Sequence, residues 1–214
     1  MIRKRLWSVQ LMEEMMDLKS PALFLMLCVL TFLVLYIKKT FIIDQIAAFE
    51  ILEERGEGGI FGLLAGLQYV SIPLIYIWKF SFFGLVLWLG AFIFGHRITY
   101  WQCWQIVAAS EFVFLLPEIL KIIWFLFIRT DPSYWDVRAF YPFSLMNSVE
   151  YEAVSPKWHY PLKSLNIFEM AYWFLLVAGV QVRIRKQYKS AFLIVFSSYV
   201  SFFLIWLVYY ILVF

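Results

Sequence analysis

The chain has 214 residues, of which 64% are hydrophobic and 21% aromatic. A soluble domain of this length has too little interior for so many apolar side chains, so the composition indicates a polytopic membrane protein. The formal net charge is +3, and the basic residues form small groups beside apolar runs, which favours membrane orientation over a nucleic-acid-binding face. We therefore expect a single all-α membrane domain and no nucleic-acid partner.

The first segment, residues 1–20, has the spacing of an amphipathic helix. Leu6, Val9, Met12 and Met16 recur at helical intervals, and the acidic residues lie away from this stripe. The pattern is typical of an interfacial helix on the cytoplasmic leaflet, and equally of a helix that docks onto a partner. No small-residue cleavage motif follows the next apolar run, so we expect it to be retained as a membrane span.

Five later segments are apolar enough to cross a bilayer, which takes about 20 helical residues. The second of them contains Lys79 and Pro73 and is compatible with one long helix or two short spans. We expect the spans at 21–39, 59–95, 104–128, 165–182 and 190–213.

Loop charge distinguishes five spans from six. Cytoplasmic loops are enriched in Lys and Arg, and the most basic segments are the N-terminus and RIRKQYK at 183–189. Both lie on the cytoplasmic side only if residues 59–95 cross the membrane once. The expected topology is a five-span bundle with the N-terminus in the cytoplasm and the C-terminus outside.

Three glycines at the start of the second span, Gly58, Gly62 and Gly66, are spaced four residues apart. This spacing places them on one side of a helix, where a neighbouring backbone can approach closely. We expect internal helix packing at this face, with a seam between two copies of the chain as the alternative.

Charged residues interrupt the third span, in which FVFLLPEILKIIWFLF covers residues 112–127. Glu111, Glu118 and Lys121 fall on roughly one face of a helix, and Glu118 is close enough to Lys121 to form a pair. Charges at membrane depth are costly unless they are paired or hydrated, so this stripe should face the bundle interior or a water-filled groove. We expect a buried pair that fixes the helix register, with a substrate or ion path as the alternative.

Two further residues bear on this stripe. Pro117 has no backbone N–H, so we expect it to kink the helix and free the carbonyl of Val113. Glu169, at the start of the fourth span, would be a second contributor to a polar path, or equally a residue at the membrane interface.

The segment 129–164 is long, aromatic and rich in proline, and we expect it to lie outside the membrane. It would cover the bundle as a lid, or contact a partner or lipid. The candidate contact residues are Trp135, Tyr141, Trp158 and Tyr160.

The sequence contains no motif typical of a catalytic, nucleotide or metal site. His96 and His159 are isolated, and Cys28 and Cys103 form no CxxC or Cys/His pattern. We therefore expect no enzyme activity, no cofactor and no metal.

The order of several segments is similar to that of a known family. FIFGHRITYWQCWQIVAAS ends the long glycine-containing run, and YPFSLMN, YPLKSLNIFEMAYWFLLVAGVQ and QYKSAFLIVFSSYVSFFLIW follow a span with a central proline. This order resembles the Yip domain family of small five-span membrane proteins, which includes bacterial members. The resemblance covers about residues 1–214 and depends on element order and loose patterns, with no invariant catalytic string.

The resemblance implies a five-helix bundle that acts through protein partners: small GTPases and vesicle machinery in eukaryotes, and accessory roles, some beside ABC-type exporters, in bacteria. Residues 1–20 contain no long polar region like that of the eukaryotic members, which favours a bacterial inner membrane, with an endomembrane as the alternative. We expect a non-enzymatic subunit or scaffold that contacts membrane lipid and other membrane proteins or further copies of itself. The alternative is a small transporter or channel that uses the stripe of Glu111, Glu118 and Lys121.

Overall fold

The computed structural model describes residues 7–44, 58–129, 132–185 and 188–214, and within these ranges it is helical, with no β-strand. The α-helices are α1 (Trp7–Asp17), α2 (Ser20–Lys38), α4 (Gly58–Ile93), α5 (Tyr100–Glu111), α6 (Leu115–Phe127), α7 (Tyr134–Ala139), α8 (Pro156–Ser164), α9 (Ile167–Ile184), α10 (Tyr188–Val195) and α11 (Ser201–Val213). Short π-helical or 3-10 segments are η1 (Lys39–Ile43), η2 (Phe112–Phe114), η3 (Leu145–Ser148), η4 (Tyr151–Ala153) and η5 (Phe196–Val200).

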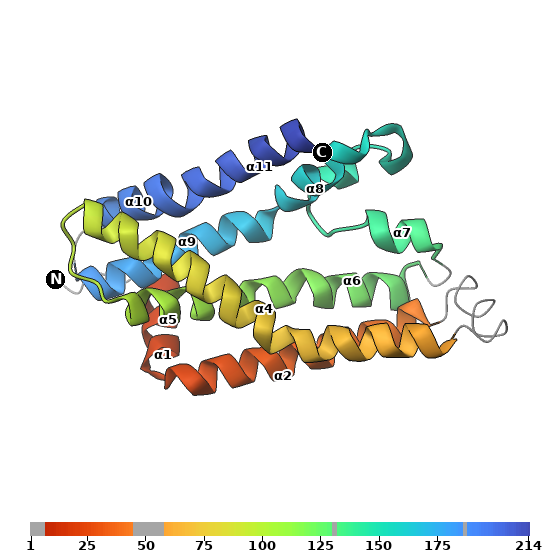
Figure 1. Cartoon of the computed structure of the whole chain (residues 1–214), viewed down its shortest axis with the longest axis horizontal. Coiled ribbons are helices and arrows are strands. Elements are labelled where there is room, and N and C mark those ends of the chain that lie inside the picture. Colours follow the sequence, from red (N-terminus) through yellow and green to blue (C-terminus); the bar gives the residue numbers. More distant parts are fainter. Residues whose placement is uncertain (1–6, 45–57, 130–131, 186–187) are drawn as a thin grey trace.

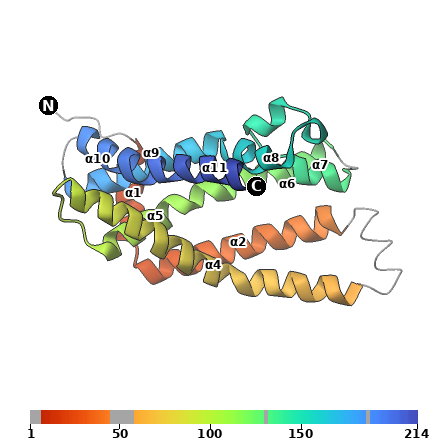
Figure 2. The ribbon, with the colours of Figure 1, turned by 45° about the horizontal axis from the view of Figure 1, so that its top comes forward.

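The long elements lie side by side along the long axis of the molecule and alternate in direction in the order α2, α4, α5 with α6, α9, and α10 with α11 (Figures 1 and 2). Helix α1 crosses one end of this bundle, where α4 passes to α5, and α7 and α8 lie at the other end. The chain is therefore an all-α helical bundle, as the composition predicts.

Among the described residues, four helical stretches are long and apolar enough to cross a membrane: Ser20–Ile43, Gly66–Ile93, Ile167–Ile184 and Tyr188–Val213. The remaining predicted span, 104–128, is divided into α5, η2 and α6, so no single helix of spanning length covers it. The bundle thus has the helices of a membrane-embedded protein, with one of its five predicted spans interrupted.

Helix α4 is a single continuous helix of 36 residues, although Pro73 lies inside it. It bends along its length (Figure 1), as expected where a proline removes one backbone hydrogen bond and clashes with the preceding turn. The segment that was compatible with one long helix or two short spans is therefore one helix.

Helix α1 packs against α9 and α5 of its own chain. Met12 and Met16 from its apolar stripe are buried, and Gln105 of α5 donates hydrogen bonds to the carbonyls of Met16 and Leu18. Arg183 of α9 in turn donates to the Gln105 amide oxygen at 2.8 Å. The apolar stripe is thus occupied within the chain, and the location of α1 at a membrane surface stays a prediction.

Close helix contacts in the core occur at glycines other than those that the spacing pattern singles out. A Cβ on Gly90 of α4 would lie 2.6 Å from the Ser198 side chain, and one on Gly179 of α9 would lie 2.6 Å from that of Ile106. Gly66 is exposed, and a Cβ there would meet nothing within 4 Å. The packing expected at Gly66 within the chain is therefore absent from the described structure, and the surroundings of Gly58 and Gly62 lie outside the described residues.

Candidate functional site

Glu111, at the C-terminal end of α5, forms an ion pair with another helix. Lys79 Nζ of α4 donates to Glu111 Oε1 at 2.6 Å and lies 4.9 Å from the centre of the Phe114 ring. The Glu111 side chain is only 4% exposed, whereas that of Lys79 is 28% exposed. The pair joins α4 to α5. A carboxylate as buried as that of Glu111 is costly unless a cation lies beside it, and Lys79 supplies that cation.

Glu118 and Lys121 do not pair with each other, so the predicted pair within α6 is wrong. Glu118 Oε2 instead accepts a hydrogen bond from Lys38 Nζ of α2 at 2.7 Å. Lys121 donates to the backbone carbonyls of Val137 and Phe140, at the C-terminal end of α7. The physical reason is that Glu118 and Lys121 each need a hydrogen-bond partner at low dielectric. The neighbouring elements supply one to each side chain.

The three charged residues of the predicted stripe therefore contact three different elements. Glu111 contacts α4, Glu118 contacts α2 and Lys121 contacts α7. Lys38 and Lys79 are not among the predicted site residues, yet each forms an ion pair with a carboxylate of the stripe. Their role as partners depends on which helices become neighbours, and no signal within one helix could have revealed it.

Pro117 is buried in the first turn of α6, directly after η2. The change from α-helix to 3-10 helix at Phe112–Phe114 precedes the position at which proline lacks a backbone donor, in agreement with the expected disturbance. The break lies next to Glu111, so the helix is irregular at the level of its most buried charge.

Glu169 lies in the first turn of α9 and is 6% exposed. Its Oε1 accepts hydrogen bonds from Trp173 Nε1 at 2.8 Å and from Tyr199 OH at 3.1 Å. Tyr199 belongs to the π-helical segment η5, between α10 and α11. Glu169 is therefore an interior residue, and a second helix irregularity lies beside a buried carboxyl group.

Two buried polar atoms near these residues have no hydrogen-bond partner among the described residues: Glu111 Oε2 and Tyr172 OH. The Tyr172 ring lies between the rings of Phe114 and Tyr199, with centroids 5.0 and 5.3 Å away. Phe114 in turn carries the Lys79 ammonium group above its ring. Lys79, Glu111, Tyr172, Glu169 and Tyr199 thus form one connected group, which we call the interior polar cluster.

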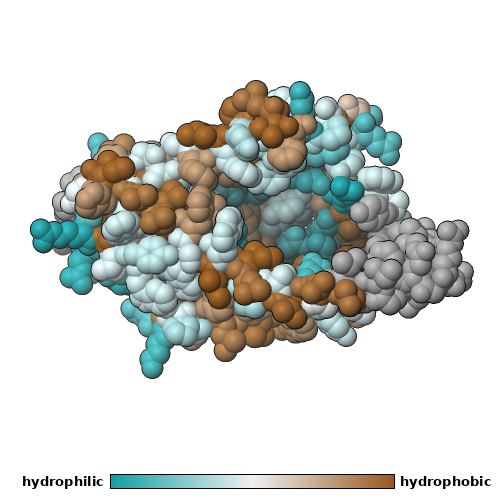
Figure 3. Space-filling model, in the orientation of Figure 1, coloured by the Kyte–Doolittle hydropathy of each residue, from teal (hydrophilic) through white to brown (hydrophobic). Residues whose placement is uncertain are grey.

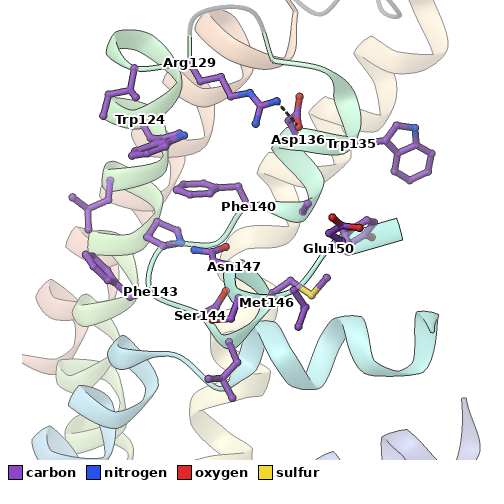
Figure 4. Close-up of a pocket in the computed structure, with 18 of the residues that line it drawn as sticks. Trp124, Arg129, Trp135, Asp136, Phe140, Phe143, Ser144, Met146, Asn147 and Glu150 are labelled. Carbon is purple, nitrogen blue, oxygen red and sulfur yellow. Dashed lines mark ion pairs between the residues drawn. The ribbon is translucent and has the colours of Figure 1, made fainter. Parts of the chain in front are cut away.

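A separate open pocket of about 1280 Å³ lies at the α7 and α8 end of the molecule (Figure 4). Its walls combine α6, α7 and the loop that precedes α8, and aromatic or aliphatic side chains predominate. Trp124 stacks on Phe140 at 5.2 Å, and Arg129 pairs with Asp136 at 3.0 Å, as the dashed line in Figure 4 shows. Trp124, Trp135, Phe140 and Met146 are among the wall residues.

The four predicted contact residues of the 129–164 segment have different surroundings. Trp135 lines the pocket and is 52% exposed. Trp158 and Tyr160 of α8 are exposed outside its lining, and the Tyr160 ring packs 4.8 Å from that of Tyr210 in α11. Tyr141 is half-buried against the main core, where burial raises the pKa of its phenol group. Trp135 is the member that combines exposure with a concave surface.

The face seen in Figure 3 is hollowed near its middle, where hydrophilic side chains form the floor and strongly hydrophobic ones lie along part of the rim. The described residues contain no group of three His, Cys, Asp or Glu side chains that could hold a metal ion.

Comparison of the chain with family models, with curated proteins and with solved structures finds no match.

Proposed function

We propose that the protein is a non-enzymatic integral membrane subunit or scaffold that binds a segment of a partner membrane protein in the pocket beside α7. The observation that carries this proposal is the pocket, which is large, open and mostly apolar. Lys121 ties the end of α7 to α6, and the Arg129–Asp136 pair joins α7 to the end of α6. Walls held in this way need little ordering when a partner binds, which favours affinity.

We also propose how the chain crosses the membrane. The α5–η2–α6 segment is the fifth crossing, the N-terminus and the basic end of α9 lie in the cytoplasm, and the pocket and C-terminus face outward. Arg183, Arg185 and Lys189 at the α9–α10 connection support this orientation by the positive-inside rule. With the resemblance to the Yip domain family, the topology favours a bacterial inner membrane and an accessory role beside an ABC-type exporter or trafficking machinery, with α1 at the cytoplasmic surface.

The experiment is purification of the tagged protein from its native membrane in a gentle detergent, with mass spectrometry of the bound proteins. We expect a stoichiometric partner that is lost in Trp135→Ala and retained in Trp158→Ala, because both tryptophans are exposed but only Trp135 lines the pocket. Isolation of the wild-type chain alone, or equal loss in both variants, would contradict binding in the pocket.

A small carrier or channel is the second candidate, favoured by the ionisable residues that several helices direct inward. Lys38, Lys79, Glu111, Glu118 and Glu169 come from α2, α4, α5, α6 and α9, and carriers characteristically place polar groups at irregular helix segments. Flux through liposomes that contain only this protein, with a steep loss in Glu118→Gln, would favour the carrier. Absence of flux together with a stoichiometric partner would favour the subunit.

A further inference from the structure

The interior polar cluster contains more acidic groups than basic ones. Glu111 and Glu169 are 4% and 6% exposed, and Lys79 is the one cation that acts on them among the described side chains. Lys79 pairs directly with Glu111, whereas the hydrogen bonds to Glu169 come from the neutral groups of Trp173 and Tyr199. With both carboxyl groups ionised, the cluster would carry one excess negative charge in an apolar interior, which is costly.

Two buried polar atoms of the cluster are left without a hydrogen-bond partner among the described residues. Glu111 Oε2 and Tyr172 OH are both inaccessible and have no partner among the described residues, and Tyr172 is within electrostatic range of both Glu111 and Glu169. Buried polar groups in proteins are commonly satisfied by a water that makes two to four hydrogen bonds. A carboxylate oxygen accepts and a phenol donates or accepts, so together they suit such a water.

We propose that Glu169 is a buried proton-binding site, reached from the Lys79 side through a water held by Glu111 Oε2 and Tyr172 OH. The proton comes from solvent, forms an O–H bond on a carboxyl oxygen of Glu169 and brings the cluster to neutrality, while Lys79 stays an ammonium ion paired with Glu111. Lys79 is the partly exposed member of the cluster, and we place the outer end of the route beside it. Tyr199, in the π-helical segment, and Trp173 orient the Glu169 carboxyl group.

This inference does not depend on the pocket or on a partner protein, and infrared difference spectroscopy tests it. The full chain in lipid nanodiscs is titrated from acid to alkaline pH, and the carbonyl stretch of protonated carboxyl groups is followed. We expect a band that persists to neutral pH and is lost in Glu169→Gln. Exchange of the Glu169 carboxyl proton for deuterium, followed by the shift of this band, should be slower in Tyr172→Phe. That variant removes only the unpartnered hydroxyl group. Glu150→Gln, at an exposed position, is the control and should leave the band unchanged.

The assignment would be overturned by the absence of a buried carboxyl band in the wild type, or by an unchanged band in Glu169→Gln. A band that disappears at constant pH when Na⁺ is added would also overturn it, because the site would then prefer a metal cation. Tyr172→Phe keeps the test informative if Glu169→Gln fails to fold, since exchange at the wild-type rate in that variant would refute the water route.

Discussion

Replacing Lys79 by methionine tests how strongly the Lys79–Glu111 pair holds α4 against α5. Removing one partner of a buried ion pair costs about 3–5 kcal/mol, because the remaining charge stays buried and unpaired. Lys79 is 28% exposed while Glu111 is 4% exposed, so for Lys79→Met we expect a loss of unfolding free energy near the lower limit, about 3 kcal/mol. The double variant Lys79→Met with Glu111→Gln leaves no charge behind and should be close to neutral in unfolding free energy.

The assay is equilibrium unfolding in mixed detergent micelles at neutral pH, with the unfolding free energies compared as a double-mutant cycle. Asp44→Asn is the control, because the Lys39–Asp44 pair is 36% and 45% exposed and should contribute less than about 1 kcal/mol. If the double variant is destabilised at least as much as Lys79→Met, the pair is hydrated rather than buried, and our account of α4 and α5 is wrong.

Three further predictions concern packing and the α7 end. Gly90→Ala should lower the unfolding free energy by about 1–3 kcal/mol through overpacking, because its Cβ would lie 2.6 Å from Ser198. Gly66→Ala should be nearly neutral in the same assay, and equal effects would contradict the packing described. Lys121→Met removes the donor to the carbonyls at the end of α7, so backbone hydrogen exchange in α7 should accelerate while that in α9 is unchanged; unaltered α7 exchange would refute this role. Burial opposes ionisation of Asp136, but hydrogen bonds from Ser133 and the charge of Arg129 outweigh it and lower the Asp136 pKa. The stabilisation is therefore fully present above about pH 4, the unfolded value, and is lost as pH falls through the lower folded pKa. Exchange in α7 should rise in that range for the wild type but not for Asp136→Asn, and a flat wild-type profile would contradict the prediction.

Much of the architecture could be predicted because it follows from local composition. Runs of apolar residues near the length of a bilayer must form helices, since a backbone without water satisfies its polar groups only through internal hydrogen bonds. The inward position of Glu111 follows from the cost of exposing a charge to lipid, and the irregular backbone before Pro117 follows from its missing donor. Both agree with the structure.

The partners of these residues could not be predicted in the same way. Helical spacing places Glu118 near Lys121, but Lys38 lies 80 positions away in the chain and pairs with Glu118 because α2 packs beside α6. The same applies to the interior polar cluster, in which Tyr199 reaches Glu169 across 30 positions.

The glycine contacts likewise separate what local spacing predicts from what helix packing decides. The spacing of Gly58, Gly62 and Gly66 identifies residues on one helix face, yet the tight contacts in the described core occur at Gly90 and Gly179. The apolar runs of the sequence thus determined the helices of this protein, and the charges within them identified the side chains that must avoid lipid. Only the tertiary structure decided which faces meet, because contact between distant segments depends on how the helices pack, and local spacing carries no information about that.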